Sequence, residues 1–207
     1  GTKNIQATLE RLGIENTVVS FYTLTDLRES FAVLGTLLDR EQRADSLLRD
    51  LDETIHVVCA RIGQTYRPRI LFVRSHTPLC VAGSDTFEDD LISHIGARNC
   101  ISSSALRYPH YTKEAVLELD PDLIIDATFY ATPSGKQRAS LKDFWKDLRI
   151  LDAVREGKVF IIQTDIHSVP GPRTPELITI LAHIAYPDLF GGQHACVERL
   201  GWEDGKR

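Results

Sequence analysis

The apolar positions between residues 44 and 62 recur at steps of four and three. Such spacing places all of them on one face of a helix. The pattern predicts a helix from Arg40 to Ile62, about 35 Å long at about 1.5 Å per residue, which is enough to join two lobes. The sequence "DREQ" at residues 39–42 has the form of a capping box that would begin this helix, and Gly63 would end it. The stripe consists of Ala44, Leu48, Leu51, Ile55, Val58 and Ile62.

Two further helices are predicted before this one, over residues 2–12 with Gly13 as the stop, and over residues 25–38. A short strand, "NTVVSF" at residues 16–21, is expected between them.

Beyond the breaker "GQTYRPR" the pattern changes to strands that alternate with helices. Strands separated by helices predict an α/β fold, a Rossmann-like parallel sheet with helices on both faces. The tail from residue 191 has no strong period and is expected to fray. The predicted strands are residues 69–73, 123–126 and 158–162, and the predicted helices lie within 84–96, 112–119, 140–157 and 173–185.

Composition and charge limit the functional classes to which the protein can belong. The 207 residues, 43% of them apolar, suffice to bury a core, and the net charge of −5 comes from mixed charges without a basic stripe. Nucleic acid is therefore not an expected partner. No run reaches the roughly 18 apolar residues of a membrane helix. The four cysteines show no CxxC pair, so buried thiols and a disulfide both stay open.

Catalytic signatures are absent from the sequence: there is no GxGxxG after a strand, no P-loop, no GxSxG and no HExxH. The seven histidines are scattered and none lies at helical metal spacing from another. We therefore predict no catalytic residue, no metal ligand and no resident cofactor.

Rings and cations gather in the loops that would leave the carboxyl ends of the predicted strands, the edge at which ligands bind in open parallel sheets. Such side chains suit a large polar or anionic ligand. Each has a simpler interpretation too: a tyrosine before a proline often packs in a turn, and Arg173, at a helix start, would usually pair with a carboxylate. The candidates are Tyr108, His110, Tyr111, Tyr130, Arg138, His167 and Arg173.

Glu114 follows a predicted N-cap, Thr112, in the first turn of a short helix. A carboxylate gains about 0.3–1 kcal/mol from the helix dipole at such a position. This stabilisation alone would explain a glutamate at position 114. The second interpretation, compatible with the first, is that Glu114 presents an exposed negative charge to a basic partner.

Three stretches in order, "VAGSDTFEDDLISHIGARN", "YPHYTKEAVLELDPDLIID" and "FWKDLRILDAVREGKVFIIQTDIHSVPGPR", resemble the periplasmic substrate-binding proteins of ABC importers for vitamin B12, ferric siderophores and haem. The resemblance covers about nine-tenths of the chain and is strongest from Arg69 to Pro187. It implies that Tyr108 faces the ligand, that Glu114 docks on the membrane permease, and that the "PGPR" turn with Arg173 lies at the cleft rim. It also implies a periplasmic or lipid-anchored extracytoplasmic location.

Members of that family begin with a first lobe that this sequence resembles only from its last helix and strand onward. The expected division is residues 1–38 as a remnant of the first lobe, 39–63 as the connecting helix, 64–190 as the C-terminal α/β lobe and 191–207 as the tail. A strand edge left exposed in the remnant would favour self-association.

The leading hypothesis is therefore a non-enzymatic binding protein that captures cobalamin or a ferric-siderophore or haem-type metal chelate and delivers it to a permease. The alternative is a truncated lobe that acts as an interaction or scaffold module without ligand binding. An α/β enzyme, the third reading, would need a nucleophile or metal triad that the sequence does not show.

Overall fold

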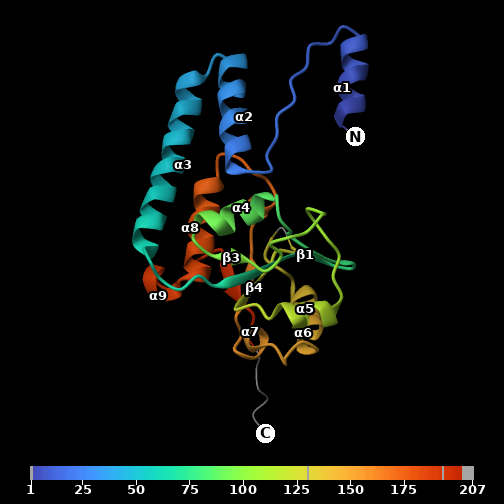
Figure 1. Ribbon diagram of the computed structural model, residues 1–207, viewed down its shortest axis with the longest axis vertical. Coiled ribbons are helices and arrows are strands. Elements are labelled where there is room, and N and C mark those ends of the chain that lie inside the picture. The colour runs from blue at the N-terminus through green and yellow to red at the C-terminus, as the bar shows by residue number, and fades with distance from the viewer. Residues whose placement is uncertain (1, 130, 193, 202–207) are drawn as a thin grey trace.

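A computed structural model of the chain describes residues 2–129, 131–192 and 194–201. Three helices come first: α1 (Thr2–Arg11), α2 (Leu24–Leu37) and α3 (Glu41–Ile62). In Figure 1, α2 and α3 rise side by side from the sheet, whereas α1 lies apart from them at the end of a long connection. The α/β body follows, beginning at residue 69. No helix among the described residues has both the length and the apolar composition needed to cross a bilayer.

A mixed sheet with a parallel centre forms this body. Strands β1 (Arg69–His76), β4 (Leu123–Asp126) and β5 (Val159–Ile162) are parallel neighbours, and β3 (Arg98–Asn99) pairs in parallel with the start of β1. The antiparallel strands β2 (Leu79–Val81) and β6 (Val197–Arg199) pair with the end of β1 and with β5. The spatial order β2-β1-β4-β5-β6 confirms the predicted α/β class.

Both faces of the sheet are covered by apolar clusters. Successive side chains of a strand point to opposite sides, so each strand contributes to both clusters. On β1, Ile70 and Phe72 pack on one side, and Leu71 and Val73 pack on the other. Helices α2, α3, α4 (Phe87–His94) and α8 (Thr174–Ala185) contribute to the first layer, and α5 (Lys113–Leu119), α6 (Gly135–Lys146) and α7 (Asp152–Arg155) to the second. The turn η1 (Asp165–His167) and the short α9 (Pro187–Phe190) flank α8.

The long helix α3 confirms the predicted stripe. Ala44, Leu51, Val58 and Ile62 are buried, and the remaining two stripe residues pack partly buried against the same core. The predicted capping box is wrong, however. The N-cap is Arg40, which makes no side-chain capping bond, and Asp39, with a positive φ of 52°, lies in the turn between α2 and α3.

Two other local expectations are wrong. Residues 14–21, predicted to include a strand, form an irregular connection, since no neighbouring strand among the described residues pairs with them. The tail from residue 191 is expected to fray, but residues 197–199 of it form β6, whose Glu198 accepts hydrogen bonds from Arg138 and Gln163. Residue 193 and residues 202–207 of the tail lie outside the described residues. The division of the chain into lobes stays a prediction.

Gly83 brings the loop that carries Tyr108 against the sheet. Its backbone N–H donates to the carbonyl oxygen of Arg107 at 2.7 Å, and a Cβ at this position would lie 2.8 Å from the carbonyl oxygen of Leu106. Only a glycine allows the two backbones to approach this closely. The position of Tyr108 beside the first turn of α4 depends on this contact.

Candidate ligand-binding cavity

A cavity of about 580 Å³ lies at the carboxyl edge of the parallel strands, the place where open α/β sheets bind ligands. The end of β1, the start of α4, the loop before α5 and the turn after β5 form one side of it. The connection between α1 and α2 forms the other. Its described lining residues are Gln6, Val18, Val19, Ser20, Phe21, Tyr22, Arg74, Phe87, Glu88, Tyr108, His167, Ser168 and Pro170.

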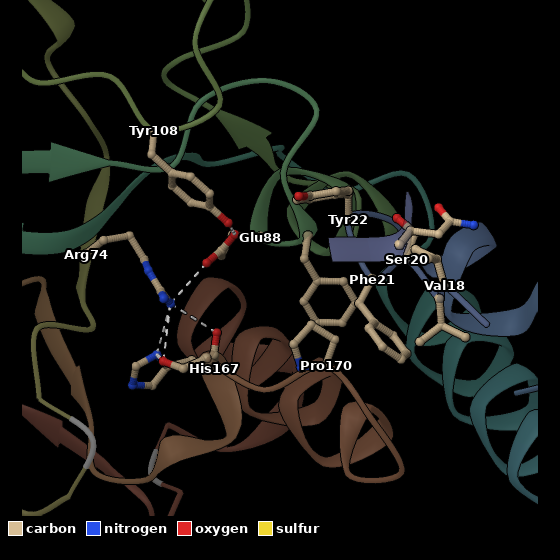
Figure 2. A pocket seen from close by; sticks show the side chains of 13 residues that line it. Val18, Ser20, Phe21, Tyr22, Arg74, Glu88, Tyr108, His167 and Pro170 are labelled. Atoms are coloured by element: carbon tan, nitrogen blue, oxygen red, sulfur yellow. Dashed lines mark hydrogen bonds and ion pairs between the residues drawn. The ribbon is translucent and has the colours of Figure 1, made fainter. Parts of the chain in front are cut away.

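Four aromatic rings, those of Phe21, Tyr22, Phe87 and Tyr108, line this cavity. They come from three separate segments of the chain, and Figure 2 labels the rings of Phe21, Tyr22 and Tyr108. Tyr22 is 46% exposed and the guanidinium of Arg107 lies 4.0 Å from its ring centroid. Flat apolar surfaces of this kind are suited to contact with a large ring-bearing ligand.

A buried ion pair lies at the centre of the polar wall, as the dashed lines in Figure 2 show. Arg74 Nη1 is 3.1 Å from Glu88 Oε1, and the Tyr108 hydroxyl donates to Glu88 Oε2 at 3.1 Å. Glu88 is only 3% exposed, and this burial raises the pKa of its carboxyl group against the opposing charge of Arg74. Because each oxygen of Glu88 has a partner, the buried charge is compensated.

His167 belongs to the same wall as a neutral ring. Its Nε2 lies 3.1 Å from the carbonyl oxygen of Phe129, to which it can only donate, and its Nδ1 lies 2.8 Å from Ser168 Oγ. Arg74 Nη1 also donates to the carbonyl oxygen of His167, at 3.2 Å. Burial, with Arg74 close by, lowers the pKa of His167 from 6.5 to about 4.

Of the residues named from the sequence, the structure brings Tyr108 and His167 to the cavity. His110 is exposed, pairs through its backbone with Cys80 and is not among the described lining residues. Tyr130 lies outside the described residues. Tyr111 packs against the apolar core on the other side of the sheet.

Both candidate arginines are engaged elsewhere. Arg173, at the start of α8, forms an exposed ion pair with Asp165 at 2.6 Å, the simpler of the two interpretations of this residue. Arg138 binds both oxygens of Glu198 at 2.6 Å each and so joins α6 to β6. Neither is among the described residues that line the cavity.

The sequence pattern does not single out Arg74 or Glu88 as site residues. The sequence position of Arg74 could have indicated a site residue, because Arg74 directly follows the predicted strand of residues 69–73 and begins one of the loops at the carboxyl ends of the strands. Nothing in the local sequence indicates that Glu88 is buried, because a carboxylate in the first turn of a capped helix is normally exposed. Its burial results from the contacts of α4 with β1 and the Tyr108 loop.

The remaining predictions from the sequence concern Glu114, the four cysteines and metal binding. Glu114 is exposed in the first turn of α5, where the Oγ1 of the N-cap Thr112 accepts from the backbone N–H of Ala115. All four cysteines are free thiols, and burial raises the pKa of Cys100 to about 12. The described residues hold no group of three or more His, Cys, Asp or Glu side chains placed to bind a metal ion.

Comparison with known families gives one model that matches, described as periplasmic binding protein, over residues 4–166. The chain is 25% identical over 179 residues to an uncharacterized ABC transporter substrate-binding lipoprotein, YvrC, of Bacillus subtilis (strain 168), which covers 84% of this chain and 54% of that protein. A vitamin B12-binding protein of Vibrio parahaemolyticus is 21% identical over 166 residues, 80% of this chain and 58% of that protein. The chain thus spans about half the length of the curated relatives it matches.

Solved structures agree on the fold. A periplasmic heme binding protein from Pseudomonas aeruginosa has a TM-score of 0.76 and 24% identity, over 95% of this chain and 72% of the other. The periplasmic vitamin B12 binding protein BtuF of Vibrio cholerae has a TM-score of 0.73 and 18% identity, over 88% of this chain and 69% of the other.

Proposed function

Because the chain belongs to the periplasmic binding protein family, we propose that it captures cobalamin or a ferric-siderophore or haem-type metal chelate and delivers it to the membrane permease of an ABC importer. The family is one of substrate-binding transport proteins and not of enzymes, and its related members are lipoproteins or periplasmic proteins. An extracytoplasmic location accords with this.

The cavity at the carboxyl edge of the sheet carries this proposal. It combines four aromatic rings with one compensated ion pair, an arrangement suited to binding a large ring-bearing ligand. A volume of about 580 Å³ lies within the usual range for small-molecule sites. The relatives named for vitamin B12 and the neighbour named for heme support metal chelates as the ligand class.

Equilibrium dialysis against cobalamin, haem and a panel of ferric siderophores tests the proposal. It should be done on the 207-residue chain. Saturable binding of one panel member is the expected result. Absence of binding to every member of the panel would refute it.

Tyr108 should contribute strongly to that binding. Replacing Tyr108 with alanine removes a half-exposed ring from the cavity wall. The affinity for the ligand should fall about tenfold to a hundredfold, because the apolar contact between this ring and the ligand is lost. Dialysis measures the affinity, and circular dichroism checks that the fold is retained. Tyr66→Ala is the matched control, because Tyr66 is also exposed but is not among the described residues of the cavity. Equal affinities for Tyr108→Ala and the unsubstituted protein would contradict the role of Tyr108.

Glu114 should affect transport and leave ligand affinity unchanged. Hydrogen bonds at the start of α5, first from its own backbone N–H and then from Thr112, lower the pKa of Glu114, so that an exposed negative charge is available to a basic permease surface. Glu114→Ala should therefore reduce uptake in cells that carry the cognate permease while dialysis shows the original affinity. Glu118→Ala, an exposed glutamate of the same helix, is the control. Full uptake with Glu114→Ala would exclude docking there.

A second function, an interaction or scaffold module without ligand binding, is favoured by one observation. Large apolar side chains are exposed along the first 38 residues, where they are available for association with another protein surface. The exposed side chains are Ile5, Leu12, Ile14, Val18, Val33, Leu37 and Leu38. Sedimentation equilibrium of the chain separates the two functions when combined with the dialysis, because the scaffold function requires association and no ligand binding.

A further inference from the structure

The Arg74–Glu88–Tyr108 group determines how the cavity can contact its cargo. Figure 2 shows the Tyr108 hydroxyl directed at Glu88, with Arg74 on the other side of the same carboxylate. The guanidinium carbon of Arg74 is also 6.0 Å from the Tyr108 ring centroid. The three side chains therefore hold one another, and the ring of Tyr108 lines the cavity while its hydroxyl is occupied.

This geometry opposes ionisation of the tyrosine. A phenolate oxygen of Tyr108 would lie 3.1 Å from a carboxylate oxygen of Glu88, and two like charges at that distance repel strongly in a poorly solvated wall. Burial first, and Glu88 second, raise the pKa of Tyr108 far above its ordinary value of 10. Iron is bound by the phenolate form of tyrosine, which is the form that Glu88 disfavours here.

Transfer of the phenol proton to Glu88 is the route by which a metal could still bind Tyr108. Glu88 has a raised pKa, which favours its acceptance of a proton, but its other oxygen is paired with Arg74. Protonation would leave the guanidinium of Arg74, whose side chain is 21% exposed, without its ionic partner. The ion pair thus holds Glu88 as a carboxylate and Tyr108 as a neutral phenol.

His167, whose imidazole is also a potential metal ligand, has both ring nitrogens in contact with other groups. Its Nε2 donates to the carbonyl oxygen of Phe129, its Nδ1 is within 2.8 Å of Ser168 Oγ, and the residue is 1% exposed. A metal ion would have to displace one of these contacts and uncover the ring.

We infer that Arg74 and Glu88 are positioning residues that hold Tyr108 as a neutral ring surface, so that the cargo binds with the coordination sphere of its metal already complete and takes no ligand from this wall. The inference rests on the proposed function, since it states which kind of metal chelate this wall of the cavity can contact. Chelates with every coordination site filled fit this wall, and an open-coordinated iron complex gains no bond from it.

Ferric nitrilotriacetate, which keeps open coordination sites, tests the inference without knowledge of the cargo. Added to the full chain, it should produce no visible tyrosinate-to-iron charge-transfer band that depends on Tyr108, so the spectra of the unsubstituted protein and of Tyr108→Phe should be the same. A band that forms with the unsubstituted protein and is lost in Tyr108→Phe would overturn the inference. Because this readout needs no cargo, it decides the matter even if every member of the dialysis panel fails to bind, which is the result that would refute the proposed function.

The positioning role of Glu88 has its own readout. The ultraviolet titration of the unsubstituted protein minus that of Tyr108→Phe isolates the Tyr108 phenol. In Glu88→Gln, which keeps a hydrogen-bond acceptor but no charge, the pKa of that phenol should fall toward 10. A merely structural glutamate would leave the titration of the phenol unchanged, and that outcome would overturn the role.

If a panel member binds, a third comparison applies. Tyr108→Phe, which keeps the ring and loses the hydroxyl, should retain affinity within about threefold, whereas Tyr108→Ala loses at least about tenfold. Equal losses in the two variants would show that the hydroxyl, and not the ring, carries the contact, and would overturn the inference.

Discussion

Replacing Asp126 with alanine should lower the free energy of unfolding by about 3–5 kcal/mol, the typical result of removing one partner from a buried charged network. Asp126 ends β4 and is 1% exposed. One of its oxygens accepts from Trp145 Nε1 at 2.7 Å and lies 2.8 Å from His76 Nε2, and the other accepts from the backbone N–H of Thr128 at 3.2 Å. Burial alone would raise the pKa of this carboxyl group, but the bonds from His76 and Trp145 help to hold it below its ordinary value.

The substitution leaves the indole N–H of Trp145 unpaired at a position with no exposed surface, and it frees His76, whose ring is stacked on Phe144 at 4.0 Å. Urea denaturation followed by circular dichroism measures the loss. Asp143→Ala on the neighbouring helix α6 is the matched control, because Asp143 is exposed and should change stability by no more than about 0.5 kcal/mol. A loss below about 1 kcal/mol for Asp126→Ala would show that the network is not holding β1, β4 and α6 together.

His167 should make the protein less stable as the pH falls from about 6.5 to about 4. Its pKa is 6.5 in the unfolded chain and about 4 in the folded protein. Above pH 6.5 neither state binds the proton, so the stability from the neutral ring is fully present. Between the two values only the unfolded state is protonated, and the free energy of unfolding falls by about 3 kcal/mol across the window.

The measurement is the pH profile of the unfolding free energy for the original protein and for His167→Gln, whose side-chain amide can still donate toward Phe129. The glutamine variant should lack the decline that His167 causes between pH 6.5 and 4. His56→Gln is the control, since His56 is exposed on α3. Parallel profiles for the original protein and His167→Gln would mean that His167 is not buried as a neutral ring.

Helices and central strands were predictable because they depend on local pattern and local chemistry. The stripe on α3, its stop at Gly63 and the N-cap Thr112 of α5 each rest on residues a few positions apart. The strands β1, β4 and β5 read as continuous apolar runs because both of their faces are covered. The edge at which the cavity lies follows from the parallel order of these strands.

Tertiary contacts decided what depends on partners far apart in the sequence. Residues 14–21 have apolar positions suited to a strand but no neighbour to pair with, whereas residues 197–199 have no strong period and are ordered by β5. The cavity wall shows the same limit. Arg74, Glu88 and Tyr108 are each ordinary in their local sequence, and only the packing of α4 against β1 and against the loop before α5 buries the carboxylate between a guanidinium and a phenol. A side chain's pattern in the sequence gives its type and its element, but its charge state and its partners are set by the segments that fold against it.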